Sequence, residues 1–295
     1  MRNVLITGAT GYFGQGMVRR LLTMPDEGVY RICVYSRDEA KQASMRATLH
    51  DPLERMRYFV GDVRDQDRLR QAMEDVDLVI HAAALKRVET GEYDTTEIVK
   101  TNVLGAMNVI EAARDANRGR QVSMRVVALS TDKACSPINA YGASKLLMEK
   151  LMLGANNARG AHGPRFSITR YGNVAGSTGS VICQWRDAIE RGRCPRITNP
   201  EATRFWMTLD QAIDLVLKVS GSAAGGELVV PELPAYRLGD LLEAMPRKVQ
   251  DLPKAQPIGL GPGEKLHERM KEDGPDSSQV RRMTVDELRE ALRSV

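Results

Sequence analysis

Two short segments near the middle of the chain carry side chains suited to acid–base chemistry. The run Ser130-Thr131-Asp132-Lys133 combines two hydroxyls, a carboxylate and an amine, and the Tyr141 phenol stands four residues before the Lys145 amine. On a helix, residues four apart share one face. An ammonium beside a phenol stabilises the phenolate and lowers the phenol's pKa. The pair of Tyr141 and Lys145 therefore predicts a tyrosine that can take a proton from a hydroxyl near neutral pH.

The first of these segments follows an apolar run, residues 126–129, which predicts a buried strand. The hydroxyls of Ser130 and Thr131 then emerge at the carboxyl end of a strand, where open α/β sheets bind their ligands. Asp132 and Lys133 lie at the same end. A surface ion pair is the alternative interpretation of these two charges, and their position favours a catalytic role instead.

A second ligand-binding pattern lies at the N-terminus. An apolar run, residues 4–6, leads into three glycines at spacings of three, and a helical pattern follows to Leu22. Glycines in this context allow a tight turn, a close approach of the backbone to a pyrophosphate and a helix N-terminus aimed at it. We therefore predict a dinucleotide site, with a purely structural turn as the alternative. The expected cofactor contacts here are Gly8, Thr10, Gly11, Tyr12, Phe13 and Gly14.

The end of the second predicted strand, residues 31–35, indicates the form of the dinucleotide. NAD-specific sites typically have an acidic residue there, which binds the ribose 2′-hydroxyl. In this chain Ser36 and Arg37 come first, and Lys41 follows within a turn. A hydroxyl and two cations suit a 2′-phosphate, so NADP is favoured over NAD. A solvated helix start is the alternative interpretation of Arg37 and Lys41.

The next two predicted strands add further expected cofactor contacts. After residues 57–60, Asp62 is placed to accept from the adenine amino group, with Val63 against the ring. The fourth strand, residues 78–84, has small residues at its end, so a dinucleotide can lie against its backbone. We interpret His81 in this strand as a satisfied core residue. The small residues are Ala82, Ala83 and Ala84.

Two polar residues near the fourth strand are also assigned to the site. Lys86 follows the strand and can reach a diphosphate, whereas a surface role is equally expected for Arg87. Residues 95–116 predict one long helix, in which Asn102 is polar among packing residues. We expect Asn102 to hold the backbone near the catalytic strand.

Strand and helix patterns alternate over the first 175 residues, with the sixth strand at residues 166–171. This alternation predicts an α/β fold, a doubly wound parallel sheet of the Rossmann type. We expect residues 1–175 to form the dinucleotide-binding domain, including the Tyr141 and Lys145 pair. Residues 176–295 are expected to form mainly a smaller substrate-binding cap, interleaved with the end of the sheet. Thr284 and Glu287 predict a capping box at the start of a last helix.

Composition excludes several classes of partner. The 295 residues include 42 basic and 38 acidic ones, interspersed, and 5% aromatics, which argues against nucleic-acid binding. The four cysteines, Cys33, Cys135, Cys183 and Cys194, lack metal-ligand spacing and predict free thiols and no metal. No signal-peptide pattern and no apolar run of about 18 residues occurs. We therefore predict a soluble cytoplasmic protein without a membrane partner.

Six motifs follow one another along the chain: Tyr35-Ser36-Arg37-Asp38, residues 129–134, residues 137–145, Arg170-Tyr171-Gly172-Asn173-Val174, Thr203-Arg204-Phe205-Trp206 and residues 262–268. With the glycine pattern and the Tyr141 and Lys145 pair, they resemble the extended short-chain dehydrogenase/reductase family, and within it the soluble, C5-inverting UDP-N-acetylglucosamine 4,6-dehydratases. Membrane-attached relatives have methionine where this chain has Tyr141, and dTDP-glucose dehydratases have Asp-Glu where it has Asp132-Lys133. Simple 4-epimerases lack that acid–base pair.

The resemblance implies a reaction on a UDP-sugar with NADP. Tyr141, as a phenolate beside Lys145, takes the C4 hydroxyl proton while a hydride moves from C4 to the cofactor. Thr131 or Ser130 steadies the C4 oxygen. Lys133 then removes the C5 proton, and its pKa is expected to be lowered by nearby Lys145 and the cationic nicotinamide. In the same scheme, the departing C6 hydroxyl receives its proton from Asp132.

The resemblance also implies the remaining contacts and a homo-oligomer. Arg204 is suited to clamp a diphosphate and Glu264 to accept from a ribose diol, with surface roles as the alternative for each. Further cofactor contacts are expected from Leu129, Ser130, Tyr141, Lys145, Tyr171, Gly172 and Val174, and substrate contacts from Lys86, Thr131, Asn173, Val181, Thr198, Arg204 and Glu264.

Because this chain departs from the family pattern at three positions, the resemblance does not determine which sugar nucleotide it binds. Gly261 and Thr178 stand where the family usually has arginines, and Cys183 stands where a proline is common. An NAD(P)-dependent nucleotide-sugar epimerase, or a dehydratase for another sugar nucleotide, is the nearest alternative function. A non-catalytic regulator that senses a dinucleotide is the alternative from another class. The joint presence of the acid–base residues argues against that regulator.

Overall fold

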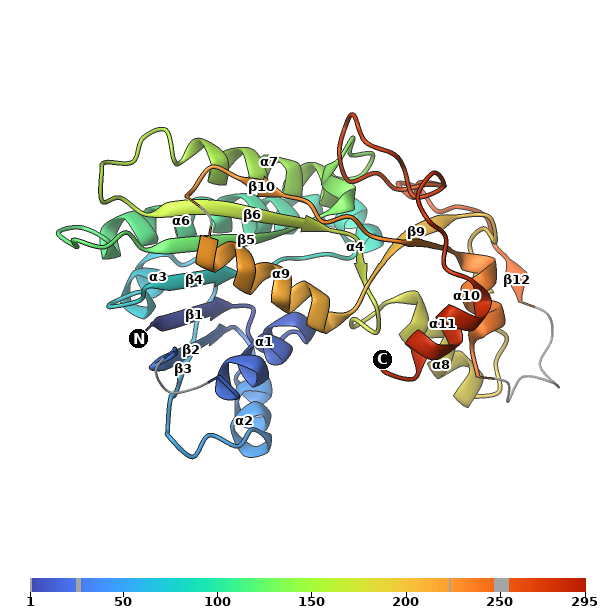
Figure 1. The fold of residues 1–295 in the computed structure, drawn as a ribbon, viewed down its shortest axis with the longest axis horizontal. Coiled ribbons are helices and arrows are strands. Elements are labelled where there is room, and N and C mark those ends of the chain that lie inside the picture. The colour runs from blue at the N-terminus through green and yellow to red at the C-terminus, as the bar shows by residue number, and fades with distance from the viewer. Residues whose placement is uncertain (1, 25–27, 223, 247–254) are drawn as a thin grey trace.

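The centre of the protein is a seven-stranded parallel sheet (Figure 1). The structure is a computed structural model that describes residues 2–24, 28–222, 224–246 and 255–295. The strand order is β10-β6-β5-β4-β1-β2-β3, so the order reverses between β1 and β4. The expected doubly wound α/β sheet of the Rossmann type is confirmed. Its strands are β1 (Asn3–Thr7), β2 (Arg31–Ser36), β3 (Met56–Val60), β4 (Leu78–His81), β5 (Arg125–Thr131), β6 (Arg165–Tyr171) and β10 (Leu228–Val229).

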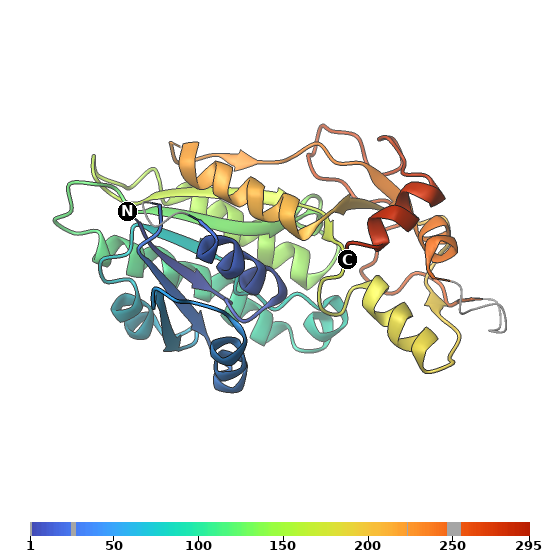
Figure 2. The same ribbon diagram turned by 60° about the horizontal axis from the view of Figure 1, so that its bottom comes forward.

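Helices cover both faces of this sheet, which gives three layers (Figures 1 and 2). Buried apolar residues alternate along a strand: Leu5 of β1 belongs to one core, while Val4 and Ile6 belong to the other. Strands buried on both faces need such nearly continuous apolar runs. One face carries α3 (Gln66–Ala72), α6 (Gly105–Ala116) and α7 (Ala140–Gly154), and the other carries α1 (Tyr12–Leu22), α2 (Glu39–Thr48) and α9 (Leu209–Ser222).

The region around β4 differs from the prediction in two ways. The strand ends at His81, and residues 82–84 form an irregular loop instead of continuing it. The expected helix 95–116 is divided into α5 (Thr95–Ile98), a π-helical turn η1 (Val99–Leu104) and α6, after the short α4 (Val88–Tyr93). The π turn holds Asn102, whose side chain bonds both backbone groups of Leu85 at 2.9 Å. The irregular helix therefore fixes the loop that follows β4.

The later part of the chain builds a smaller unit at the carboxyl ends of the strands (Figure 1). Its own core includes Trp185, Trp206 and Leu288. Helix α9 and strand β10 return from this part of the sequence to the large sheet. The unit contains a three-stranded sheet of β7 (Asn173–Val174), β9 (Thr203–Met207) and β11 (Ala235–Arg237), the short pair β8 (Arg196–Ile197) and β12 (Gln256–Pro257), and helices α8 (Val181–Glu190), α10 (Leu238–Ala244) and α11 (Val285–Leu292).

The structure also bears on the predictions about the last helix, the cysteines, membrane helices and metal ligands. Helix α11 begins with the expected capping box, in which Thr284 Oγ1 accepts from the Glu287 N–H at 3.2 Å and Glu287 Oε2 accepts from the Thr284 N–H at 2.8 Å. All four cysteines are free thiols, as predicted. Within the described ranges, no helix is long and apolar enough to cross a membrane. The same residues contain no group of three or more His, Cys, Asp or Glu side chains placed to hold a metal ion.

Candidate active site

The predicted catalytic side chains lie close together at the carboxyl end of β5. Thr131 ends the strand, and its hydroxyl caps the following turn, η2 (Asp132–Ala134), by accepting from the Lys133 N–H at 3.4 Å. The same hydroxyl donates to Asp132 Oδ1 at 2.9 Å. Helix α7 then begins after Asn139, whose side chain accepts from the Gly142 N–H at 2.7 Å. The strand, the turn and the capped helix together fix the orientation of these groups.

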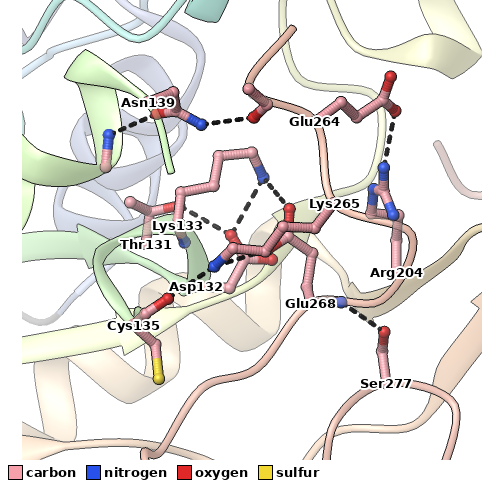
Figure 3. Close-up of polar contacts among 12 residues, drawn as sticks. Thr131, Asp132, Lys133, Cys135, Asn139, Arg204, Glu264, Lys265, Glu268 and Ser277 are labelled. Carbon is pink, nitrogen blue, oxygen red and sulfur yellow. Dashed lines mark hydrogen bonds and ion pairs between the residues drawn. The ribbon is translucent and has the colours of Figure 1, made fainter. Parts of the chain in front are cut away.

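Lys133 lies between two buried carboxylates (Figure 3). Its Nζ is 3.1 Å from Asp132 Oδ1 and 3.3 Å from Glu268 Oε1. The Asp132 side chain is 0% exposed and that of Glu268 is 2% exposed. Burial lowers the pKa of Lys133, but the two carboxylates outweigh burial and raise it above its ordinary value. The expectation that the pKa of Lys133 is lowered is therefore wrong for this structure.

Three oxygens in this region are buried without a hydrogen-bond partner among the described residues: Ser130 Oγ, Asp132 Oδ2 and Glu268 Oε2. Buried polar atoms normally have partners, so each exception needs a reason. A ligand rich in hydroxyl groups supplies donors and acceptors for such atoms. The arrangement at the end of β5 therefore fits a site that receives a polar substrate.

Tyr141 and Lys145 both lie on the buried face of α7, 9% and 4% exposed. Burial raises the pKa of Tyr141 to about 12, while the Lys133 charge and the Thr131 hydroxyl oppose this rise. Burial lowers the pKa of Lys145 to about 8, which Glu149 partly opposes. The prediction that Lys145 lowers the pKa of Tyr141 is wrong here, because the cation that acts on the phenol is Lys133.

His81 lies beneath this region and is a core residue, as predicted. Its ring Nδ1 is 2.8 Å from Thr7 Oγ1, and the side chain is buried. Burial and the nearby Lys145 charge lower the pKa of His81 to about 3, so it stays neutral at ordinary pH. A histidine held in this way has no part in proton transfer near neutral pH.

The N-terminal glycine turn has the geometry of a phosphate cradle. Gly8 has φ +69°, and a Cβ there would lie 2.9 Å from the Ala83 Cα. A Cβ at Gly14 would lie 2.5 Å from the Ala9 Cα. Helix α1 has no side-chain cap at Gly11 and no acidic residue in its first turn, so its first N–H groups can bind an anion. The turn therefore fits the pyrophosphate of a dinucleotide against the residues after β4.

The other predicted cofactor residues near the glycine turn, Thr10, Tyr12 and Phe13, each contact neighbouring parts of the protein. Thr10 is buried, and its carbonyl accepts from Gln15 Nε2 at 2.9 Å. Tyr12 donates its hydroxyl to the Ala175 carbonyl at 3.0 Å and so joins the turn to the segment after β7. Phe13 is half-buried and packs on the core under α1 and α9.

Ser36 ends β2, Arg37 follows it, and Lys41 lies in the first turn of α2, all at the carboxyl end of β2. Ser36 is buried, and its Oγ accepts from Gln42 Nε2 at 3.0 Å. Arg37 and Lys41 are 53% and 66% exposed. Arg37 Nη1 is 3.6 Å from Asp62 Oδ2, and Lys41 Nζ is 3.2 Å from Asp38 Oδ2. Both cations thus already have weak carboxylate partners.

Asp62 and Val63 differ in how accessible they are. Burial raises the pKa of Asp62, but hydrogen bonds from Arg64 outweigh it, and the pKa is lowered overall. Arg64 Nη2 lies 2.7 Å from Asp62 Oδ2. Val63 is buried, and its Cγ2 would lie 2.8 Å from a Cβ at Gly105. The adenine contacts expected of these residues stay predictions.

The loop after β4 carries the small residues and Lys86. Ala82, Ala83 and Ala84 are half-buried beside the glycine turn. Burial and the neighbouring Arg87 charge lower the pKa of Lys86. Asn102 reaches from η1 to this loop and also donates to Ser144 Oγ of α7 at 3.0 Å. The expectation that Asn102 holds the backbone near the site is confirmed.

On the far side of the site, three predicted substrate residues contact one another. Arg204 Nη2 donates to Glu264 Oε1 at 2.7 Å, and Thr198 Oγ1 donates to the same oxygen at 3.1 Å. Arg204 is 5% exposed, and its Nη1 donates to the Thr203 and Leu266 carbonyls. The Arg204 guanidinium therefore donates hydrogen bonds to other groups of the protein, and its role in binding a diphosphate stays a prediction.

The remaining predicted residues follow the ends of β5 and β6. Tyr171 pairs with Thr131 in the parallel register. A Cβ at Gly172 would lie 2.6 Å from Phe205 Cβ and 3.5 Å from Asp132 Oδ2, so only glycine fits between β9 and the acid. Leu129, within β5, and Tyr171, the last residue of β6, are buried in the same core. Asn173 and Val174 form β7, and Val181 begins α8.

Glu268 is the residue at this site that the sequence interpretation missed. It belongs to the polar segment 262–268, which the sequence marks as a motif, but a carboxylate far along the chain gives no sign that it reaches Lys133. Lys265 of the same segment donates to the Cys135 carbonyl at 2.7 Å and lies 3.9 Å from Glu268 Oε2. The segment therefore closes over η2 (Figure 3).

Three comparisons relate the chain to known proteins. Residues 4–287 match a family described as polysaccharide biosynthesis protein. UDP-N-acetylglucosamine 4,6-dehydratase (inverting) of Campylobacter jejuni is 44% identical over 271 residues, 91% of this chain and 77% of that protein. UDP-glucose 4-epimerase of Rickettsia bellii is 40% identical over 270 residues, 91% and 77% of the two chains. The X-ray structure of Pen from Bacillus thuringiensis, 34% identical, superposes with a TM-score of 0.91 and covers 100% of this chain and 98% of that chain.

Proposed function

Because the chain belongs to the polysaccharide biosynthesis protein family, we propose that it is an NADP-dependent nucleotide-sugar 4,6-dehydratase. The substrate we propose is UDP-N-acetylglucosamine, with inversion at C5, as the name of the Campylobacter jejuni relative states for that protein. One observation carries the proposal: the buried Asp132 carboxylate and the Lys133 amine, 3.1 Å apart, share a site with Tyr141. An oxidation alone needs the tyrosine, whereas a dehydration also needs an acid and a base.

The cofactor residues support the choice of a nicotinamide dinucleotide. The glycine turn and the free N-terminus of α1 would hold its pyrophosphate, and the exposed cations Arg37 and Lys41 would bind a 2′-phosphate. A dinucleotide held there would supply a reversible hydride acceptor for C4 of the sugar and the hydride donor for C6. Such a cofactor ends each cycle as it began, so it is needed only in catalytic amount.

The first step falls to Tyr141 and Thr131. Tyr141 takes the proton of the C4 hydroxyl, and the Thr131 hydroxyl holds the C4 oxygen as it becomes a ketone. Burial keeps the pKa of Tyr141 at about 12 without ligands, so the phenol is protonated in the resting site. The Lys133 charge already acts on the phenol in this resting state, and the further positive charge of a nicotinamide ring bound beside the phenol would lower its pKa from there. Lys145 contributes an amine with a pKa of about 8 one helical turn away.

The second step falls to Asp132 and Lys133. A proton that moves from Lys133 Nζ to Asp132 Oδ1, across 3.1 Å, turns the ion pair into a neutral amine and a neutral carboxyl. The amine then removes the C5 proton, which is acidic because it lies next to the C4 ketone. The carboxyl gives its proton to the departing C6 hydroxyl, which leaves as water. The pair is back in its charged form. As the hydride returns to C6, a proton from solvent adds to the opposite face of C5 and completes the inversion, and Tyr141 releases to solvent the proton that it took from the C4 hydroxyl.

The second candidate function is a nucleotide-sugar 4-epimerase, favoured by the 40% identical relative of Rickettsia bellii, which carries that name. An epimerase needs Tyr141 but has no use for a proton donor and acceptor at C5 and C6. The buried pair of Asp132 and Lys133 therefore favours dehydration. A dehydratase for another sugar nucleotide has the same residues and differs only in its substrate contacts.

Product analysis separates these candidates. UDP-N-acetylglucosamine is incubated with the enzyme in heavy water, and the product is identified by NMR. We expect deuterium at C5, a new C6 methyl group and inverted configuration at C5. A product that differs only at C4 would show an epimerase, and steady accumulation of reduced cofactor would show a plain dehydrogenase. The cytoplasmic location and the homo-oligomeric state stay predictions.

A further inference from the structure

A buried carboxylate outside the predicted catalytic residues lies against Lys133. Glu268 Oε1 is 3.3 Å from Lys133 Nζ, and the Glu268 side chain is 2% exposed. Its second oxygen has no hydrogen-bond partner among the described residues, and Lys265 Nζ stays 3.9 Å away. A carboxylate removed from water is costly unless a cation or a donor stabilises it. Lys133 is the cation closest to this carboxylate in the described part of the chain.

The backbone around Glu268 is held rigidly by neighbouring elements. Its N–H donates to Ser277 Oγ at 2.9 Å, and its carbonyl accepts from the Ser277 N–H at 2.8 Å. Before it, Asn139 Nδ2 donates to the Gly263 carbonyl at 2.8 Å. After it, Arg170 Nη1 of β6 donates to the Met270 carbonyl at 2.7 Å. The carboxylate is therefore fixed relative to β6 and the start of α7, the elements that carry the rest of the site.

We propose that Glu268 is a positioning residue of this site: its carboxylate fixes the Lys133 amine beside Asp132 and determines the pH at which that amine becomes a base. The first part of this inference stands on the geometry alone. The second part rests on the proposed function, in which Lys133 removes the C5 proton.

The other charged and titratable groups that face Lys133 are accounted for. Asp132 comes from its own turn and Tyr141 from α7, and both favour the ammonium. Arg204 of β9 disfavours the ammonium, but Arg204 is itself paired with Glu264. The charge balance around Lys133 thus depends on two carboxylates. One of them, Asp132, has to become an acid during the reaction, so Glu268 is the constant partner of the amine.

The titration of Lys133 tests the geometric part directly. The full-length enzyme is labelled with carbon-13 at the lysine ε-carbons, and the Lys133→Met variant identifies the resonance. In Glu268→Gln we expect the midpoint of Lys133 to fall by about one pH unit or more, because an opposite charge within about 4–6 Å shifts a pKa by that amount. The matched control is Asp273→Asn, which removes an exposed carboxylate a short way after Glu268 in the chain and is expected to leave the midpoint unchanged.

A second variant guards against a folding defect. Glu268→Asp keeps the charge and is expected to keep the midpoint of Lys133 above that of Glu268→Gln. Equal midpoints in the wild type, Glu268→Gln and Glu268→Asp would overturn the proposal. If Glu268→Gln shows no titration of Lys133 up to about pH 11, above the ordinary lysine pKa of about 10.4, the proposal is overturned as well, because removal of the charge must bring the midpoint toward that range.

The rate of C5 deuterium incorporation tests the functional part. A base works only when deprotonated, so in Glu268→Gln we expect the rising limb of the pH–rate profile to move to lower pH by about one unit. A merely structural role would lower the rate equally at every pH and leave the limb in place, which would overturn this part. If the wild type makes no dehydrated product but the Lys133 midpoint still shifts, the proposed function fails while the geometric inference stands.

Discussion

The pKa values of two lysines on adjacent elements shift in opposite directions. Lys145 on α7 is 4% exposed, and burial lowers its pKa to about 8, which the Glu149 charge partly opposes. Lys133 in η2 is 21% exposed and touches two carboxylates, which raise its pKa. The comparison shows that burial alone favours a neutral amine, whereas two carboxylates in contact reverse the direction.

This difference assigns different chemistry to the two amines. Lys145 releases its proton near pH 8, where it can exchange protons within the site without a partner. The raised pKa keeps Lys133 charged near neutral pH, so at that pH it becomes a base when its proton moves to a carboxylate, and Asp132 Oδ1 is 3.1 Å away. The structure thus couples the base at C5 to the acid at C6.

The largest effect is expected from removal of the Lys133 amine. Lys133→Met should lower dehydration by roughly a thousandfold, because a positioned base typically contributes about 10²–10⁴ in rate. Oxidation at C4 should persist, so reduced cofactor should accumulate on addition of substrate, as followed by absorbance. The matched control is Lys150→Met, which removes an exposed amine from α7. Full dehydration by Lys133→Met would break the assignment of Lys133 as the base.

A smaller loss is expected from the acid. Asp132→Asn should lower dehydration by roughly a hundredfold, since the C6 hydroxyl then leaves without a proton from this group. Its product can be quantified by NMR from the C6 methyl signal. Asp132→Asn also removes one of the two carboxylates on Lys133, so the midpoint of Lys133 should fall. An unchanged Lys133 midpoint would contradict the claim that the carboxylates in contact with Lys133 raise its pKa.

Lys145 offers a test through stability. Its folded pKa of about 8 lies below the ordinary lysine value, so folding releases a proton and is penalised at lower pH. Stability should therefore rise with pH above about 8, and Lys145→Met should lack this rise. Between about pH 7 and pH 9.5 we expect the wild type to gain about 2 kcal/mol relative to Lys145→Met. Urea unfolding at the two pH values measures this difference. An equal change in the free energy of unfolding for the wild type and Lys145→Met would contradict it.

The smallest effect is expected at an exposed lysine, where neither burial nor enclosed carboxylates act. Lys41 is 66% exposed and, among the described residues, forms an ion pair with Asp38. Lys41→Ala should change the free energy of unfolding by less than about 1 kcal/mol, as for other surface pairs. If Lys41 binds the 2′-phosphate, Lys41→Ala should weaken NADP binding by up to about tenfold and leave NAD binding unchanged. Calorimetry with both cofactors checks this, and equal losses for the two would contradict the assignment.

Local patterns in the sequence predict much of the fold. Gly8 and Gly11 stand between β1 and α1 and Gly14 lies in the first turn of α1, and the apolar runs become the buried strands. Deviations occur where a distant contact overrides the local pattern. The helix around Asn102 becomes a π turn where that side chain holds Leu85. The division into domains at residue 175 and the individual site roles stay predictions.

The electrostatics of the site could not be predicted in the same way. The spacing of Tyr141 and Lys145 suggests a lowered phenol pKa, but burial, which the spacing does not reveal, raises it to about 12. The pKa of Lys133 depends on Glu268, which reaches it only through the folding of the late segment over η2. Tertiary contacts between distant residues determine both values.

The central claim is that Asp132 and Lys133 turn an oxidation at C4 into a dehydration. The most direct test uses UDP-N-acetylglucosamine that carries deuterium at C4. With the wild-type enzyme we predict that the deuterium appears in the C6 methyl group of a 4-keto product, and that Lys133→Met does not transfer it there. Deuterium found again at C4, in a product of inverted C4 configuration, would contradict the account.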